Sequence, residues 1–215
     1  MNRSFDTFIF DLDGTLLDTL ADLVALTNRV LREAGFSQRS ERQIQSYIGD
    51  GLWALLQRAA PKASASELDQ MLDNWMHLYP KVGMLQTKEY AGISSMLEKL
   101  KRRNKNLAVL SNKFDDGVAS LIPTLFPHVF SVYQGVCDRV ERKPNPQGLQ
   151  NLIAGFGTPL DKVAYIGDSP VDIITARAAG VEPIGVSWGY HTKAQLLAQH
   201  PFAIIESPHE LLHFA

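Results

Sequence analysis

Short apolar runs recur along this chain, and each is followed by polar or glycine residues. The first run covers residues 7–10 and ends at Asp11. A run of about four to eight apolar, β-prone residues bounded by turn residues is typical of a buried strand. The same pattern predicts further strands at 106–110, 129–132, 163–166, 183–186 and 202–205.

Helical spacing of apolar residues lies between these runs. Three sets each share one face of a predicted helix: Ile93, Met96, Leu97 and Leu100; Leu149, Leu152 and Ile153; Ile173, Ile174 and Ala178. The expected helix ends are Gly155 for the second set and Gly180 for the third. Because strands alternate with helices, we expect an α/β fold, with a doubly wound, mainly parallel, Rossmann-like sheet.

Residues 18–80 break this alternation. A helix is predicted from about residue 20 to a stop at Gly35, and others at about 40–47, 52–60 and 64–79. Connections between a strand and a helix are usually short, so we interpret this segment as an all-helical insert after the first strand. The predicted domains are a Rossmann-like core, residues 1–15 and 86–215, and a helical cap, residues 16–85.

Composition narrows the class of protein. The chain has 215 residues and a net charge of −2, with both signs spread along it, whereas a nucleic-acid binder would show a basic stripe. Asp6 and Asp11 interrupt the first apolar stretch, and no run approaches the roughly 18 residues of a membrane span. We therefore expect a cytoplasmic protein with no nucleic-acid or membrane partner, as a monomer or weak homodimer.

Cysteine usage excludes two kinds of site. Cys137 is the single cysteine, so neither an intrachain disulfide nor a cysteine zinc cluster can form. We expect Cys137 to be a buried structural thiol.

Carboxylates gather where predicted strands end. The stretch Asp11–Thr15 (DLDGT) ends the first strand and carries Asp11 and Asp13. The stretch Gly167–Asp172 (GDSPVD) follows a later strand and adds Asp168 and Asp172. Strand carboxyl ends bind ligands in open α/β sheets, and paired carboxylates are costly without a cation. Helix capping by Asp168 or Ser169 is a compatible alternative. Together the two stretches favour a cation site at the ends of these strands.

Two further segments carry groups suited to an anion. Ser111, Asn112 and Lys113 follow a third strand, and a hydroxyl, an amide and backbone N–H groups at such a turn can bind an anion. A serine that only caps the next helix is the alternative. Lys143 lies between Arg142 and Pro144 in a loop; alone, it would be read as an ordinary surface lysine.

These four motifs, in this order, resemble the haloacid dehalogenase superfamily of phosphotransferases, and most closely its phosphoglycolate-phosphatase-like branch. The resemblance runs from Asp11 to Asp172 and includes a helical cap after the first motif. Residues 90–93 (YAGI) and 186–190 (VSWGY) are also similar to that branch. We interpret Trp188, Tyr190 and His191 in this last loop as packing residues.

The resemblance implies a Mg²⁺-dependent phosphatase that forms an aspartyl-phosphate. Asp11 would be the nucleophile, and Asp13 the general acid and base. Ser111, Asn112 and Lys143 would bind the phosphoryl oxygens. Mg²⁺ would be held by Asp11, Asp168 and the main-chain carbonyl of Asp13. Asp172 would support that site or orient Lys143.

The substrate is less constrained than the chemistry. Gly49, Asp50 and Gly51 lie between two predicted cap helices; in related proteins such a loop helps to select the substrate, although it is equally an ordinary glycine turn. The expected substrate is a small phosphate ester, with 2-phosphoglycolate the leading candidate. The alternatives are a nucleotidase, a pyrophosphatase, a β-phosphoglucomutase or a non-catalytic regulatory module. A mutase usually carries Ser-x-Ser at the second motif, where this chain has Ser111–Lys113.

Overall fold

The computed structural model describes residues 3–137 and 140–215. The chain forms two compact units, Met1–Leu17 with Glu89–Ala215, and Asp18–Lys88. These limits lie two or three residues after those expected from the sequence. Two short strands, β2 (Leu17–Asp18) and β3 (Lys88–Glu89), pair with each other where the chain passes between the units.

The first unit is built on a six-stranded sheet with the strand order β5-β4-β1-β6-β7-β8, and neighbouring strands of this sheet pair in parallel. The strands are β1 Thr7–Phe10, β4 Asn106–Phe114, β5 Val132–Val136, β6 Val163–Gly167, β7 Glu182–Val186 and β8 Ala203–Ile205. The predicted Rossmann-like α/β fold is therefore confirmed.

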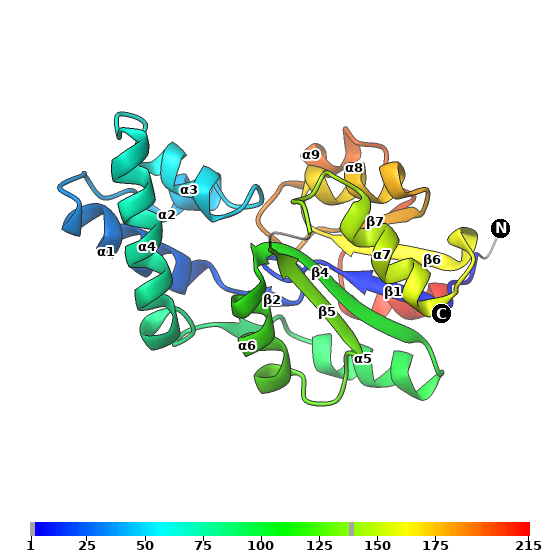
Figure 1. Ribbon diagram of the computed structural model, residues 1–215. Helices are drawn as coiled ribbons and strands as arrows, with labels where there is room; N and C mark the ends of the chain where they lie inside the picture. The colour runs from blue at the N-terminus through cyan, green and yellow to red at the C-terminus, as the bar shows by residue number, and fades with distance from the viewer. Residues whose placement is uncertain (1–2, 138–139) are drawn as a thin grey trace. The chain divides into compact units, whose positions relative to one another are not determined.

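Helices cover both faces of this sheet (Figure 1). They are α5 Ile93–Arg102, α6 Asp115–Leu125, α7 Gln147–Phe156, α8 Pro170–Ala179 and α9 Lys193–Leu197, with 3₁₀ turns at Leu160–Lys162 and Pro208–Phe214. Parallel strands are joined by right-handed crossovers. The connections through α5 and α6 run toward one edge of the sheet, and those through α7 and α8 run toward the other. The two pairs of helices consequently lie on opposite faces.

Strand β1 occupies a central position because its side chains suit burial on both faces. All four of its residues are buried, as expected for a strand inside a parallel sheet. Phe10 at its end is opposite Val109 of β4 and Ile166 of β6. The residues that follow these three strands therefore start from one edge of the sheet, where ligands bind in open α/β folds.

Helix α8 begins close to that edge with strong local signals. Ser169 is its N-cap and forms a capping box with Asp172, and Pro170 occupies the first turn. Gly180 ends the helix in the left-handed conformation, with φ of 79°. The buried face of α8 is Ile173, Ala176 and Ala179, whereas Ile174 is exposed. The end of the helix was therefore predicted correctly. Of the predicted face, Ile173 is buried, whereas Ile174 and Ala178 are exposed.

Three local expectations were wrong. Strand β5 begins at Val132 rather than 129, because Phe130 instead packs in a loop, edge to face with Phe10 and Phe126. Helix α7 continues past Gly155 to Gly157, since Phe156 still packs against the hydrophobic core. Cys137 is exposed rather than buried.

The second unit is helical, with α1 Leu20–Glu33, α2 Glu41–Gln45, α3 Leu52–Ala59 and α4 Ala65–Val82. Capping boxes begin α2 (Ser40 with Gln43) and α4 (Ser64 with Glu67). Its buried apolar side chains include Leu26, Val30, Leu31, Ile44, Leu56, Met71 and Trp75. Asp22 ties the end of the unit to α1, since its carboxylate accepts hydrogen bonds from Gln86 and Thr87. Among the described residues, none of the helices has the length and apolar character to cross a bilayer.

Candidate active site

Asp11 and Lys143 form a buried ion pair at the edge of the sheet. Asp11 follows β1, and its backbone N–H donates to the carbonyl of Ile166 in β6. Lys143 donates to Oδ1 of Asp11 at 2.8 Å. Both residues are less than a tenth exposed. The loop lysine is therefore part of the site rather than a surface residue.

Three groups fix the position of Lys143. Its Nζ also donates to Asp172 at 2.7 Å and to the Tyr165 hydroxyl at 2.9 Å, and that hydroxyl donates to the carbonyl of Leu110. The Asn112 side chain binds the backbone of Lys143 at both ends, accepting from its N–H at 2.7 Å and donating to its carbonyl at 3.0 Å. Lys143 is thus held at its main chain and at its ammonium.

Asp172 uses both carboxylate oxygens within this network. Oδ1 accepts from Lys143, and Oδ2 accepts from the backbone N–H of Ser169 at 3.0 Å and its hydroxyl at 2.6 Å. The same side chain therefore starts helix α8 and binds the lysine ammonium. Capping and a role in the site coexist at this residue.

Asp168 lies in a closely packed loop after β6. Its carboxylate accepts from the backbone N–H of Tyr190 at 2.7 Å and from the Thr15 hydroxyl at 3.4 Å. A Cβ on Gly14, whose φ is +85°, would come within 2.5 Å of the Asp168 carboxylate. A Cβ on Gly189 would overlap Asp168 and the carbonyl of Gly14. Glycine at these two positions allows the two loops to meet around Asp168.

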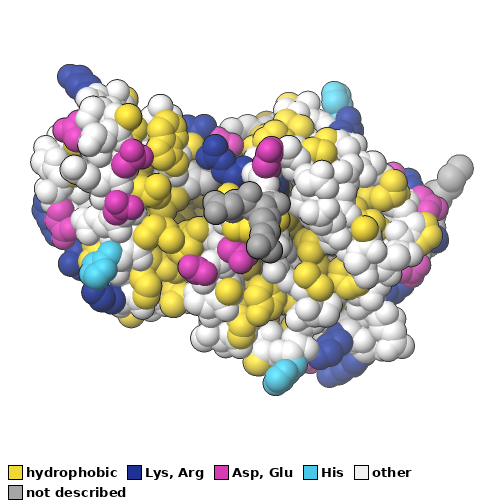
Figure 2. Space-filling view, viewed as in Figure 1, with side chains coloured by type: hydrophobic (Ala, Val, Ile, Leu, Met, Phe, Trp, Pro, Cys, Tyr) yellow, Lys and Arg dark blue, Asp and Glu magenta, His cyan; other side chains and the backbone are white. Residues whose placement is uncertain are grey.

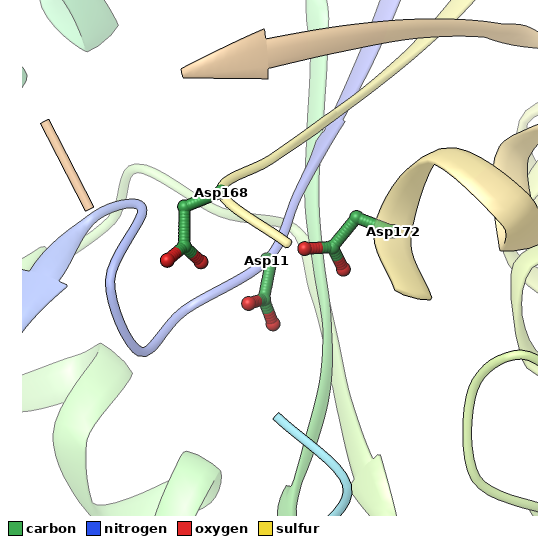
Figure 3. Close-up of side chains that lie close together, drawn as sticks. All are labelled: Asp11, Asp168 and Asp172. Carbon is green, nitrogen blue, oxygen red and sulfur yellow. The ribbon is translucent and has the colours of Figure 1, made fainter. Parts of the chain in front are cut away.

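Asp11, Asp168 and Asp172 converge (Figure 3), with a carboxylate oxygen of each within 4.8 Å of those of the other two. Four carboxylates, including Asp13, are accompanied by two paired lysines, Lys113 and Lys143, which leaves two negative charges if all six groups are ionised. Oxygen ligands and this charge fit a hard divalent cation such as Mg²⁺.

The pKa shifts of the buried groups agree with a cation bound at this site. Burial raises the pKa of Asp11 to about 8, with Lys143 opposing the rise and the charges of Asp172 and Asp168 adding to it. Burial also raises the pKa of Asp168. For Lys143, burial favours the neutral amine, but the carboxylates of Asp11 and Asp172 outweigh it and hold its pKa well above the usual value. A bound cation would lower the pKa values of Asp11 and Asp168, because it stabilises the ionised carboxylates.

Asp13 has a separate partner. Lys113 Nζ lies 3.2 and 3.3 Å from the two carboxylate oxygens of Asp13. Ser111 is buried, and its Oγ accepts from the backbone N–H of Lys113 at 3.2 Å. Strand β4 continues to Phe114 with a register shift against β5, so Ser111–Lys113 lie within the strand, not after it as expected.

Several contributors were missed at the sequence level. Tyr165 lies inside an apolar strand and looked like core, although its hydroxyl binds Lys143. Lys113 was named only as part of its motif. His191 was interpreted as packing, yet its Nδ1 lies 3.7 Å from the Asp168 carboxylate. The sequence could have indicated Tyr165, because its hydroxyl interrupts an apolar run. No comparable feature of the sequence indicated Lys113 or His191.

The predicted specificity loop belongs to the helical unit. Gly49, Asp50 and Gly51 lie between α2 and α3, and both glycines have positive φ, 119° and 84°. The Asp50 carboxylate forms an ion pair with Arg58 of α3. The loop is therefore tied to the helix that follows it.

Comparisons with known proteins agree with this fold. Residues 8–186 match the family model of haloacid dehalogenase-like hydrolases. The chain is 31% identical to a phosphoglycolate phosphatase of Mannheimia succiniciproducens, with 99% of both chains covered. It is 33% identical to one of Neisseria meningitidis over 84% of this chain and 80% of the relative. A crystal structure of a predicted phosphoglycolate phosphatase from Haemophilus somnus superposes with a TM-score of 0.90 at 28% identity, covering 97% of this chain and 96% of that one.

The family match spans most of the chain, including Asp11, Ser111, Lys143 and Asp168. The chain therefore belongs to the haloacid dehalogenase-like hydrolase family. Within this family it is a phosphatase of the phosphoglycolate-phosphatase-like type. The resemblance stated from the motifs is confirmed.

Proposed function

We propose that this protein hydrolyses a small phosphate monoester through an aspartyl-phosphate on Asp11. The observation that carries the proposal is the buried pairing of Asp11 with Lys143, 2.8 Å apart, beside the carboxylate of Asp168. A carboxylate nucleophile divides hydrolysis into two easier displacements. A fixed ammonium beside it supplies the positive charge that phosphoryl transfer needs.

In the first step, an oxygen of Asp11 attacks phosphorus and the bond from phosphorus to the alcohol oxygen breaks. Asp13 gives its proton to that oxygen, so the alcohol leaves neutral. In the second step, Asp13 accepts a proton from water as the water oxygen attacks phosphorus. Inorganic phosphate then leaves, and the Asp11 carboxylate is restored.

Lys143 and Ser111 are assigned to the phosphoryl oxygens. Both residues are buried. Ser111 lies in β4, and Lys143 contacts Asp11 at the edge of the sheet. Asn112 was predicted to bind phosphate as well, but its amide contacts the backbone of Lys143. We therefore propose that Asn112 contributes by positioning Lys143.

Mg²⁺ would be held by the carboxylates of Asp11 and Asp168 with the main-chain carbonyl of Asp13, and would neutralise charge on the transferred group. Asp172 is assigned a supporting role, since both of its oxygens already accept hydrogen bonds from Lys143 and Ser169. This assignment keeps Asp172 as the group that orients Lys143.

The leading substrate is 2-phosphoglycolate. The support is similarity to relatives named phosphoglycolate phosphatases over nearly the whole chain. On the face seen in Figure 2, acidic and basic side chains of the described residues are interspersed rather than gathered by sign, which suits a small substrate better than a nucleic acid. We further propose that Gly49, Asp50 and Gly51 help to select the substrate, and that the protein acts in the cytoplasm as a monomer or weak homodimer.

The alternatives within the same chemistry are a nucleotidase, a pyrophosphatase and a β-phosphoglucomutase; a non-catalytic regulator is the alternative from another class. The test is kcat/KM with 2-phosphoglycolate, nucleoside monophosphates, pyrophosphate, sugar phosphates and β-glucose 1-phosphate. We expect 2-phosphoglycolate to be the best. A nucleotide or pyrophosphate preferred by about tenfold, roughly 1.4 kcal/mol in the transition state, would overturn the substrate assignment. Absence of hydrolysis across the whole panel would favour the regulator.

A further inference from the structure

A second buried ammonium lies in the active site. Lys113 is about a tenth exposed, and its Nζ is within 3.3 Å of both carboxylate oxygens of Asp13. Lys143 is the ammonium that contacts Asp11. The two lysines therefore accompany two different carboxylates, one on the nucleophile and one on the proposed general acid.

This arrangement gives the site two positive groups with different neighbours. In the proposed reaction, the phosphoryl group must reach Asp11, and the oxygen of the leaving group must reach Asp13. A substrate held in this way has its phosphoryl end beside Lys143 and its leaving group beside Lys113. Lys113 is consequently placed to contact the leaving group.

Ser111 and Lys113 lie close together in β4, which suits a small leaving group. The two residues are two positions apart, and the Ser111 hydroxyl accepts a hydrogen bond from the backbone N–H of Lys113 at 3.2 Å. One short molecule can thus contact both the Ser111 hydroxyl and the Lys113 ammonium. A phosphorylated hydroxy acid with one carbon between ester oxygen and carboxylate is such a molecule.

We propose that Lys113 selects substrates whose leaving group carries a carboxylate close to the ester oxygen. An ammonium has three N–H donors and no acceptor, so it can donate to Asp13 and to a substrate carboxylate together. A hydrogen bond to a charged partner contributes more than one between neutral groups. This inference rests on the proposed function and places part of the specificity in the sheet unit rather than in the cap.

The test compares two substrates that differ only at the proposed contact. They are 2-phosphoglycolate and 2-hydroxyethyl phosphate, in which an alcohol replaces the carboxylate. The ratio of their kcat/KM values is measured for the wild type, Lys113→Met and Lys113→Arg. We expect the wild type to prefer 2-phosphoglycolate at least tenfold, about 1.4 kcal/mol. Both rates can fall in Lys113→Met because Asp13 loses its partner, so the ratio is the informative quantity.

We expect the ratio to fall about 10- to 100-fold in Lys113→Met, as for loss of one charge-assisted hydrogen bond, and to stay within about threefold in Lys113→Arg. Lys99→Met, an exposed site on α5, is the matched control and should not alter the ratio. Equal losses on both substrates in Lys113→Met would overturn the inference and leave Lys113 as a positioning residue for Asp13.

The wild type alone also provides a test if the Met variant does not fold. Equal kcat/KM for the two substrates would contradict the inference while leaving the phosphatase proposal intact. Failure of the wild type to hydrolyse any ester with Mg²⁺, including p-nitrophenyl phosphate, would instead count against the proposed function. The two failures are therefore distinguishable.

Discussion

Lys143 donates a hydrogen bond of 2.8 Å to Asp11, although 132 residues separate them in the chain. The pair forms because β1 is central in the sheet and the loop before α7 returns to the same edge. The positive charge is thus placed by folding of the sheet unit. A phosphoryl group that enters the site would meet Asp11, the proposed nucleophile, and the Lys143 ammonium together.

Replacement of Asp11 by Asn should abolish turnover without unfolding the protein. The amide has nearly the same shape but cannot form an acyl phosphate, so we expect kcat to fall by at least about a thousandfold. The rate of p-nitrophenyl phosphate hydrolysis checks the loss of turnover, and circular dichroism checks that the fold is kept. Asp6→Asn, at an exposed carboxylate paired with Lys105, is the control. Substantial residual activity in Asp11→Asn would show that another group attacks phosphorus. Beryllium fluoride, which mimics phosphorylated aspartate, should inhibit both the wild type and Asp6→Asn, because both keep Asp11.

Activity should require Mg²⁺, and Ca²⁺ should replace it poorly. The carboxylates of the site offer few oxygens, which suits the six-coordinate, partly hydrated Mg²⁺, whereas Ca²⁺ favours six to eight ligands at longer distances. The measurement is kcat after exhaustive EDTA treatment and after each ion is restored. Full activity in the chelated protein would exclude the proposed role of the metal.

Asp172→Ala should destabilise the protein more than Ser169→Ala. Both changes remove the capping box of α8, worth about 1 kcal/mol, but only Asp172→Ala also removes a carboxylate 2.7 Å from buried Lys143. Breaking a buried ion pair typically costs about 3–5 kcal/mol, and since Lys143 keeps Asp11, we expect about 3 kcal/mol in total. Urea denaturation of the two variants measures the difference. If their free energies of unfolding fall equally, Asp172 acts only as a helix cap.

The helical unit should respond to occupation of the active site. It is inserted just after the proposed nucleophile and is joined to the sheet unit through two chain crossings, where β2 and β3 pair. Closure of such an insert would exclude water from the reaction. We expect hydrogen exchange in residues 18–88 to slow when beryllium fluoride and Mg²⁺ are added. Asp11→Asn should show no such change, and equal exchange in the wild type would contradict a lid role.

Much of the sheet unit could be predicted because its signals are local. The apolar run before Asp11 identified β1, and Ser169, Pro170 and Gly180 marked both ends of α8. These signals depend on residues within a few positions of one another. Strand β5 was misplaced because Phe130 is apolar for a different reason, namely aromatic packing from a loop.

The partners within the site could not be derived in the same way. The contact between Lys113 and Asp13 spans 100 residues, and that between Asn112 and Lys143 spans 31. Which lysine meets which carboxylate depends on strand order and on a register shift in β4. Motifs therefore identified the carboxylates and Lys143, whereas Tyr165 and the pairing of the groups required the three-dimensional structure.

Gly14 and Gly189 restrict how this protein can evolve. Neither position has room for a methyl group against Asp168, and every single-base missense change in a glycine codon introduces a larger side chain. Substitutions at these two positions should therefore be rejected during evolution, even though neither glycine carries a reactive group. A saturation-mutagenesis library selected for activity should retain glycine at both positions. Glycine retained at positions 14 and 189 would then indicate the importance of Asp168, in addition to retention of Asp168 itself.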